Sequence, residues 1–338
     1  MTTLSESGSA RRATMNDVAR LAGVSIKTVS RVVNDESGVH PATAERVLAA
    51  IDQLGFRRNL GARNLRRGTE TGTIGMVLED LANPFYSVLT RAAEEVARAN
   101  GKQVLTGSSD EDPARERELV LEFCSRRVDG LLVVPAGHQH GYIAHEINSG
   151  TPVVFMDRPG GNVSADTVLV DNAGGTAHAV RHLAEHGHRA IAFLGDAPDI
   201  HTAAERLRGF REGCAQAGVP FEPGLVQMGP HTTESVAATL DRMLPRATAL
   251  VTGNNRITVE ALRALSGRAH RPALVGFDDF ELADLLDPPI TVITHDTREL
   301  GRSAAELLFA RLDGDPAPPR RHVLPTRLLP RGSGEVSP

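Results

Sequence analysis

The sequence predicts an α/β protein in which a small helical N-terminal domain precedes a two-lobed body of parallel β-sheets. Between residues 14 and 54, apolar residues recur at helical spacing in three short segments. From residue 73 onward, apolar runs alternate with amphipathic helical segments, a pattern typical of repeated βαβ units and hence of parallel sheets. The chain has 338 residues, which suits two or three domains.

The first two helical segments lie on either side of a tight turn. Thr14 is a suitable N-cap for the first helix, with Asp17 as its capping partner three residues on. Gly23 supplies the turn, and Ser25 is placed to cap the second helix. The apolar residues expected on the inner faces of these helices are Val18, Leu21, Ala22, Val29, Val32 and Val33. This pattern is typical of a helix-turn-helix, whose second helix enters the DNA major groove, although a plain helical hairpin is the alternative.

A third helix is expected to complete this small domain. It begins at Thr43 and ends at Gly55, and its core positions are Val47, Leu48, Ile51 and Leu54.

Charge is distributed unevenly along the chain. Residues 11–68 contain eleven basic and five acidic residues, a surplus of six positive charges. Since the formal charge of the whole chain is −5, the remaining residues carry −11. A basic N-terminal region on an acidic body indicates contact with phosphate, which favours DNA binding over the plain hairpin.

The exposed start of the second helix carries side chains suited to reading bases. Ile26 can cover a thymine methyl group, Lys27 can donate to guanine, and Arg31 one turn later can also reach a base edge. The side chains expected on phosphate, where they set register without reading sequence, are Thr28, Ser30 and Asn34.

The N-terminal region resembles the DNA-binding domain of the lactose-repressor (LacI/GalR) family of bacterial transcription regulators. The matching segments are Asp17-Val18-Ala19, Ala22-Gly23-Val24-Ser25, Thr28-Val29-Ser30-Arg31-Val32-Val33-Asn34, Val39, Thr43, Arg46-Val47, Leu54-Gly55-Phe56, Asn59 and Ala62-Arg63-Asn64-Leu65. The resemblance then covers nearly all of the remaining chain. It implies a body like that of periplasmic binding proteins, in which the chain crosses between two Rossmann-like lobes more than once.

The resemblance identifies the basic segment after Phe56 as a hinge helix that folds on DNA. It implies that Leu65 is a wedge between base steps of the minor groove, and that Asn59, Arg63 and Arg66 also contact DNA. The sequence departs from the family at Arg58, where proline is frequent, and Gly61 weakens a free helix by about 1 kcal/mol relative to alanine. A flexible basic linker is the alternative.

These observations divide the chain into five parts. They are a disordered arm (1–12), a helix-turn-helix domain (13–58), a hinge helix and linker (59–71), a two-lobed effector-binding and dimerisation domain (72–330) and a tail (331–338). We expect lobe one to hold residues 72–170 and 296–320. We expect lobe two to hold residues 172–290 and a last strand at Val323–Leu329.

The candidate effector site lies at the carboxyl ends of the strands, where open α/β sheets bind ligands. Aromatic rings that follow the first strand can stack on a sugar or a base, and polar side chains after later strands suit a polyol. The residues are Phe85, Tyr86, Asp157, Arg158, Thr202, Arg206, Asn254 and Asp278. The resemblance implies that the loop of Phe85 and Tyr86 lines the effector pocket, that Arg206 holds ligand hydroxyls or carboxylates, and that Asp278 accepts from a ligand hydroxyl. Each of the polar residues alone is more often a helix cap or an ion-pair partner, but their recurrence at strand ends favours a site. Asn254-Asn255 stands where the resembling family commonly has Asn-Asp.

Enzyme-like and metal-binding patterns are weak. The segment from His182 to His186 fits the zinc-peptidase signature H-x-x-E-H, but no third ligand follows at a suggestive place. A phosphate-binding loop, a G-x-G-x-x-G motif and a nucleophile elbow are missing. We therefore expect no enzyme activity, no cofactor and no bound metal.

The chain lacks the signals of secretion or membrane insertion. Two cysteines, Cys124 and Cys214, give no disulfide framework. No apolar run reaches the roughly 18 residues of a membrane span, and the first residues lack the apolar core of a signal peptide. These features predict a cytoplasmic protein.

The sequence thus predicts a homodimeric transcriptional repressor that binds a near-palindromic operator and responds to a small effector, a sugar, between its lobes. A periplasmic sugar-binding protein would have no use for residues 14–65, and a Rossmann enzyme would need a phosphate loop or a nucleophile. The remaining alternative is a regulator of the same family that responds to a nucleobase, a nucleoside or a partner protein.

Overall fold

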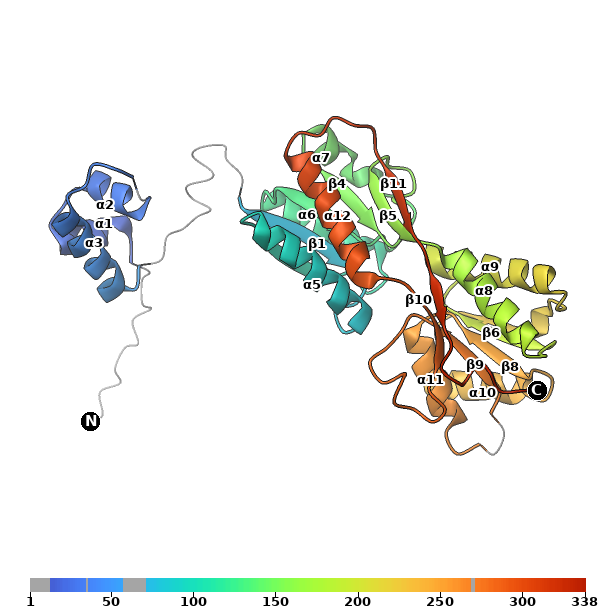
Figure 1. Ribbon diagram of the computed structural model, residues 1–338. Helices are drawn as coiled ribbons and strands as arrows, with labels where there is room; N and C mark the ends of the chain where they lie inside the picture. Colours follow the sequence, from blue (N-terminus) through green and yellow to red (C-terminus); the bar gives the residue numbers. More distant parts are fainter. Residues whose placement is uncertain (1–12, 35, 57–70, 269–270) are drawn as a thin grey trace, which may run out of the picture. The chain divides into compact units, whose positions relative to one another are not determined.

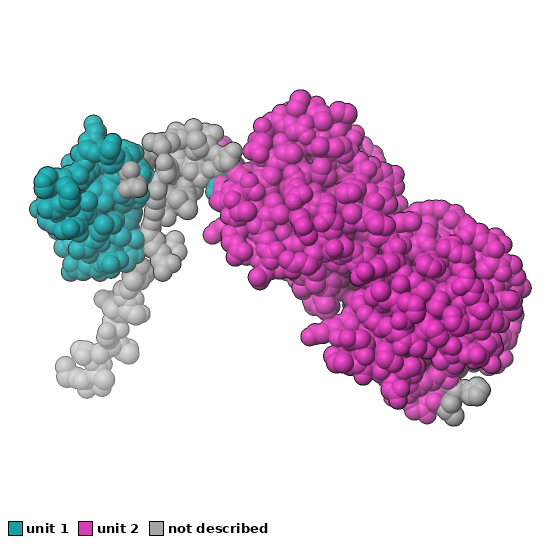
Figure 2. Space-filling view, viewed as in Figure 1, with its two compact units in different colours: residues 1–71 teal, residues 72–338 magenta. Residues whose placement is uncertain are grey.

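The computed structural model describes residues 13–34, 36–56, 71–268 and 271–338. The chain divides into two compact units, unit 1 (residues 1–71) and unit 2 (residues 72–338) (Figure 2). Among the described residues, no helix is long and apolar enough to cross a membrane.

In its described residues, unit 1 contains the helices α1 (Met15–Ala22), α2 (Ile26–Val33) and α3 (Pro41–Leu54). Thr14 and Asp17 form the expected capping box, in which the backbone N–H of Thr14 donates to Asp17 Oδ2 over 2.9 Å. Gly23 adopts φ 65°, a left-handed conformation that ends α1. The Ser25 hydroxyl accepts the Thr28 N–H at 3.1 Å and so begins α2.

The core of unit 1 differs from the sequence prediction at two leucines, whereas the predicted residues Val32, Val33, Ile51 and Leu54 do pack against it. The buried residues that pack together are Val18, Ala19, Ala22, Val29, Val47 and Ala50. Leu21 and Leu48, which were expected in this core, are 45% and 54% exposed, so both expectations are wrong. The core-facing sides of α1 and α3 each carry a buried valine and, one turn away, a buried alanine. The neighbouring Leu21 and Leu48 therefore lie on the outer surface.

Unit 2 consists of two lobes, each with a six-stranded sheet. The sheet of lobe one has the order β11 (Arg321–Leu324), β5 (Asp166–Val170), β4 (Val153–Met156), β3 (Gly130–Val133), β1 (Thr73–Leu78) and β2 (Gln103–Ser108). The sheet of lobe two has the order β12 (Arg327–Leu329), β10 (Thr291–Thr294), β9 (Ala273–Phe277), β8 (Ala249–Thr252), β6 (Ile191–Gly195) and β7 (Val226–Met228). All neighbouring strands are parallel except β10 and β12, which are antiparallel. The expected α/β fold with two parallel-sheet lobes is confirmed.

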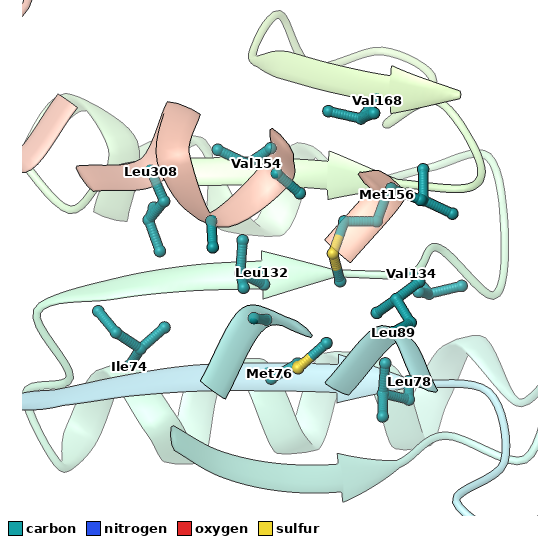
Figure 3. Close-up of a cluster of buried hydrophobic side chains, with 14 of the residues drawn as sticks. Ile74, Met76, Leu78, Leu89, Leu132, Val134, Val154, Met156, Val168 and Leu308 are labelled. Atoms are coloured by element: carbon teal, nitrogen blue, oxygen red, sulfur yellow. The ribbon is translucent and has the colours of Figure 1, made fainter. Parts of the chain in front are cut away.

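Helices cover both faces of each sheet, which explains the nearly continuous apolar strands. In lobe one, α5 (Pro84–Ala99) and α12 (Thr297–Leu312) pack on one face, where Figure 3 shows Leu89 and Leu308 beside Met76, Leu132 and Val154 of the strands. The opposite face is covered by α6 (Pro113–Ser125) and by the 3-10 turn η1 (Gly141–Ile143) with α7 (Ala144–Asn148).

Lobe two is built in the same way. Helices α8 (Asn172–Glu185) and α9 (His201–Ala217) cover one face, and α10 (Thr233–Met243) and α11 (Asn255–Leu265) cover the other. A short 3-10 turn, η2 (Pro223–Leu225), leads into β7. Strand β7 and the η1–α7 segment are each too short to show a period in the sequence.

The chain crosses between the lobes three times, after β5, after β10 and between β11 and β12 (Figure 1). The single last strand expected at Val323–Leu329 is therefore wrong. Strand β11 pairs with β5 in lobe one and β12 pairs with β10 in lobe two. Pro325 lies between them and has no N–H to offer a ladder, so the strand is interrupted there. Strand β10, at residues 291–294, also belongs to lobe two.

Residues 331–338 pack on lobe two. Ser333 is buried, and its hydroxyl donates to the carbonyl of Leu274 at 2.6 Å and accepts the N–H of Thr291 at 2.9 Å. His182 Nε2 lies 2.5 Å from Glu335 Oε1, so the first histidine of the H-x-x-E-H segment helps to hold this tail.

Candidate functional site

The exposed start of α2 presents the side chains that the sequence assigned to base reading. Ile26 is 50% exposed, Lys27 is exposed, and Arg31 is half-buried one turn later. The Thr28 hydroxyl lies 2.9 Å from that of Ser25, and the Asn34 amide donates to Ser30 and to Glu36. A hollow between the starts of α1 and α2 is lined by Thr14, Asn16, Asp17, Ala19, Arg20, Val24, Ser25 and Ile26. The positive end of the α2 dipole at this hollow suits a phosphate.

The predicted hinge contacts lie outside the described residues. They are Asn59, Arg63, Leu65 and Arg66.

The second candidate site lies where the strands of both lobes end. In lobe one, Glu79 follows β1, and Asp157 and Arg158 follow β4. In lobe two, Asp196 follows β6 and Asp278 follows β9. The carboxyl ends of parallel strands meet at one edge of a sheet, so each lobe gathers its polar side chains at one edge.

Arg158 lies at the centre of the lobe-one half of this site. Its Nη1 and Nη2 atoms donate to the two carboxylate oxygens of Glu111, each at 2.6 Å. Nη1 also donates to the Pro135 carbonyl at 3.0 Å, and Nη2 lies 3.5 Å from Glu79 Oε2. The Arg158 side chain is only 6% exposed, so its charge is neutralised by acids of the chain itself.

The two predicted aromatic residues have different environments. Tyr86 is 2% exposed within the lobe-one core, and its hydroxyl donates to Glu79 Oε2 at 2.9 Å. Phe85 is half-buried, and its ring meets those of Tyr86 and His295 edge-on with centroids 4.8 and 5.7 Å away. Phe85 is therefore the better placed of the two to contact a ligand.

Arg206 lies at the centre of the lobe-two half. Its Nε donates to Asn172 Oδ1 at 2.7 Å, a further N–H donates to the Gly253 carbonyl, and Nη2 lies 3.4 Å from Asp278 Oδ2. The guanidinium stacks 3.9 Å above the centroid of the Phe277 ring. Thr202 is buried one turn earlier on the same helix.

Asp278 retains an unused hydrogen-bonding oxygen. Its Oδ1 atom is buried and has no hydrogen-bond partner among the described residues, although His295 Nδ1 lies 3.6 Å away. Both Asp157 and Asp278 adopt φ 64°, a conformation that is uncommon outside glycine and that clusters at functional sites.

The segment from Asn254 to Arg256 connects the two lobes. Asn254 caps α11 by accepting the Ile257 N–H at 2.8 Å, and its amide donates to Asp196. Asn255 Nδ2 donates across to Asn83 Oδ1 at 3.0 Å. Arg256 Nη1 lies 3.3 Å from Asp80 Oδ2. The residues that depart from the resembling family thus form contacts between the lobes.

Burial dominates the electrostatics of the site. Together with the negative charge of Glu111, burial raises the pKa of Glu79 to about 7. Burial also raises the pKa of Asp157 and of Asp196 above their usual range, and it lowers the pKa of His295. The site is therefore rich in carboxyl groups whose ionisation is unfavourable without a partner.

The sequence missed several residues of this site. They are Glu79, Asn83, Glu111, Asn172, Asp196 and His295. All follow strands of the two sheets, so the rule of strand ends could have found them. Their partners could not have been found, because Glu111 and Arg158 are 47 positions apart in the sequence.

Two family models match this chain. Residues 14–59 match the bacterial regulatory proteins of the lacI family, and residues 180–334 match the periplasmic binding protein-like domain. The HTH-type transcriptional regulator CelR of Thermobifida fusca is 34% identical over 341 residues, which cover 96% of this chain and 99% of CelR.

Solved structures give the same result. A CelR–cellobiose complex matches with TM-score 0.70 and 32% identity, over 95% of this chain and 100% of that one. The lac repressor dimer bound to operator and the anti-inducer ONPF matches with TM-score 0.82 and 26% identity, over 96% and 100%. The expected family resemblance is confirmed. With 34% identity sustained over almost the whole of both chains, this sequence belongs with CelR in the lacI family of bacterial regulatory proteins, as a DNA-binding transcriptional regulator.

Proposed function

We propose that this regulator is a cytoplasmic, homodimeric repressor whose affinity for a near-palindromic operator changes when a sugar binds between its two lobes. The observation that carries the proposal is the set of polar side chains gathered at the strand ends of both lobes. Asp157 of lobe one lies within electrostatic reach of Arg206 and Asp278 of lobe two. Carboxylates and a guanidinium held by a rigid scaffold suit the hydroxyls of a sugar, and Phe85 offers a ring edge.

The contacts between the lobes supply a means of coupling. Asn255 with Asn83, and Arg256 with Asp80, are made in the arrangement of lobes described above. His138 Nε2 and the carbonyl of Asp199, 2.8 Å apart, form a further contact of this kind. A sugar that binds one arrangement of the lobes more tightly shifts the population toward it. The same differential affinity then changes DNA binding, because the two equilibria are linked.

Exposed leucines support the homodimer. Leu282, Leu285 and Leu286, between β9 and β10, are 58%, 75% and 38% exposed. Apolar surface of this kind is typical of an interface, and a two-fold dimer would place two helix-turn-helix domains on the two half-sites of a palindrome.

For the sugar site, we expect neutral sugars to stabilise the purified protein in thermal melts. A ligand present at about 100 times its dissociation constant adds about 2.7 kcal/mol of stability. Asp278→Asn should remove this shift, because it removes the carboxylate with the unused oxygen while asparagine still tolerates φ 64°. Asp313→Asn, an exposed site at the end of α12, is the matched control and should keep the shift. A panel of pentoses, hexoses, disaccharides, nucleobases and nucleosides in which only nucleosides bind would contradict a sugar effector.

For the DNA-binding face, Lys27→Ala should relax base preference at one operator position by about 1–3 kcal/mol. Lys27 is exposed at the start of α2, where a recognition helix meets base edges. Arg66→Ala, a proposed phosphate contact, should instead weaken binding to every sequence alike. Fluorescence anisotropy on a set of single-base operator variants distinguishes the two patterns. A uniform loss for Lys27→Ala would contradict the assignment of this residue to base reading.

A further inference from the structure

The Arg158–Glu111 pair occupies the two terminal nitrogens of the Arg158 guanidinium; among the described residues only the buried Nε, 3.6 Å from Asp157 Oδ2, has no hydrogen-bond partner. Both Nη atoms of Arg158 already donate to the carboxylate of Glu111 in the parallel two-bond geometry that a phosphate or a ligand carboxylate would need. The Arg158 side chain is 6% exposed and that of Glu111 is 26% exposed. Glu111 is thus the more accessible member of the pair. Because Glu111 is part of the chain, an anionic ligand must displace its carboxylate in order to bind the Nη atoms of Arg158.

The other cations of the site are paired in the same way. Arg206 is held by Asn172, by the carbonyl of Gly253 and by Asp278. Arg256 lies 3.3 Å from Asp80 Oδ2 and 3.7 Å from Glu79 Oε1. Acids remain in excess around these three arginines. They are Glu79, Asp80, Glu111, Asp157, Asp196 and Asp278. A negatively charged ligand would therefore meet carboxylates and, among the described residues of the site, arginines that are already paired.

The loop that carries Glu111 is shaped to deliver its side chain to Arg158. Asp110 and Glu111 adopt φ 53° and 60°, two successive left-handed conformations at non-glycine residues. Asp110 donates its backbone N–H to the Glu79 carbonyl at 2.8 Å, which ties the loop after β2 to the end of β1. Burial and the negative charge of Glu111 together raise the pKa of the neighbouring Glu79 to about 7. Glu111, which accepts both short hydrogen bonds from Arg158, is therefore the carboxylate that neutralises it.

We propose that Glu111 determines the charge selectivity of the effector site: by occupying the guanidinium of Arg158, it restricts the effector to sugars that carry no negative charge. This inference rests on the proposed function, which locates the effector site between the two lobes. It adds that phosphorylated sugars and sugar acids are rejected, and it names the residue responsible.

The first experiment uses inorganic phosphate as the probe and needs no knowledge of the effector. Thermal melts compare phosphate with chloride at equal ionic strength for the wild type, Glu111→Gln and the double variant Glu79→Gln/Glu111→Gln. The double variant is included because Glu79, 3.5 Å from Arg158, can ionise and take the place of Glu111. Glu122→Gln is the matched control, since Glu122 forms a comparable pair with Arg126 on the exposed face of α6. Phosphate should raise the melting temperature of at least the double variant by about 2 °C or more, and should not shift the wild type or the control.

The second experiment measures selectivity in the wild type. A neutral sugar that binds should bind at least about 100-fold more tightly than its phosphorylated or carboxylate form, as expected when like charges meet in a buried site. This comparison stands even if the Glu111 variants do not fold.

Each result bears on a different claim. Phosphate stabilisation of the wild type equal to that of the variants, or tighter binding of the sugar phosphate than of the neutral sugar, would overturn the role of Glu111. The family assignment and the binding of DNA would then be unaffected. Phosphate-dependent stabilisation of the variants in a protein that binds no sugar would support the role of Glu111 and contradict the proposed function.

Discussion

Replacing Arg206 with alanine is expected to lower the free energy of unfolding by about 3–5 kcal/mol and to abolish the response to effector. The substitution removes the partner of three buried groups at once: the Asp278 carboxylate, the Asn172 amide oxygen and the Gly253 carbonyl. It also removes the guanidinium that stacks 3.9 Å above the Phe277 ring. A buried carboxylate that loses its charge partner accounts for most of the expected loss.

Arg208→Ala provides a matched control two residues later on the same helix. Arg208 is 51% exposed and pairs with Glu205 and Glu212 on the surface of α9. Exposed pairs of this kind contribute less than about 1 kcal/mol, so this variant should keep nearly all of its stability and its effector response. Urea denaturation of both variants gives the two free energies. Equal losses would show that Arg206 acts only as a surface charge, in contradiction to the geometry of the site.

Glu79→Gln is expected to change the pH dependence of stability. Burial and the charge of Glu111 raise the pKa of Glu79 from its ordinary value of 4.5 to about 7. Between these two values the folded protein retains a proton that the unfolded chain has lost, so unfolding releases a proton and stability falls as pH rises. A difference of this size corresponds to about 3 kcal/mol, present in full below pH 4.5 and lost as pH rises to about 7.

The variant removes this contribution because glutamine is neutral at every pH. The stability of Glu79→Gln relative to the wild type should therefore increase by about 3 kcal/mol as pH rises from about 4.5 to about 7. Burial lowers the pKa values of His178, His188, His201 and His295, which has the opposite effect on the pH dependence of stability. The wild type and the variant share these histidines, so their effect cancels in the comparison. The charged and titratable groups around Glu79 are Tyr86, Glu111, Arg158, Asp196 and Arg256. Glu122→Gln, on the exposed face of α6, should follow the wild-type profile, and parallel profiles for all three proteins would contradict the prediction.

The helices of unit 1 and the two-lobed architecture could be predicted because their signals are local. Thr14, Gly23 and Ser25 mark helix ends by capping and turn chemistry that depends on a few neighbouring residues. The prediction of Leu21 and Leu48 as core residues is wrong. Helical spacing alone is compatible with either of two adjacent helix faces toward the core, and only the packing of the three helices determines which face is buried. Pro325 separates β11 from β12 within the expected strand Val323–Leu329, and a proline is itself a local signal of such an interruption.

The candidate site was predictable in position and less so in chemistry. Asp157 and Asp278 follow strand ends, and the rule for open sheets locates them. Arg206 lies within α9, and only the family resemblance pointed to it. What the sequence does not contain is which charges meet. The carboxylate opposite Arg158 comes from the loop after β2, and the partner of Asn255 comes from the other lobe. Such pairings are tertiary, and they decide whether an arginine is available to a ligand or already neutralised.

The most direct test of the account is DNA binding with and without a sugar. The purified protein first selects its preferred sites from a random DNA pool, and the anisotropy of the enriched sequence is then titrated with a neutral sugar that stabilises the wild type. We predict a near-palindromic site whose affinity changes with the sugar in the wild type and remains constant in Asp278→Asn. An enriched site without two-fold symmetry, or an affinity that no stabilising sugar alters, would contradict the central claim that this chain is a homodimeric, sugar-responsive regulator.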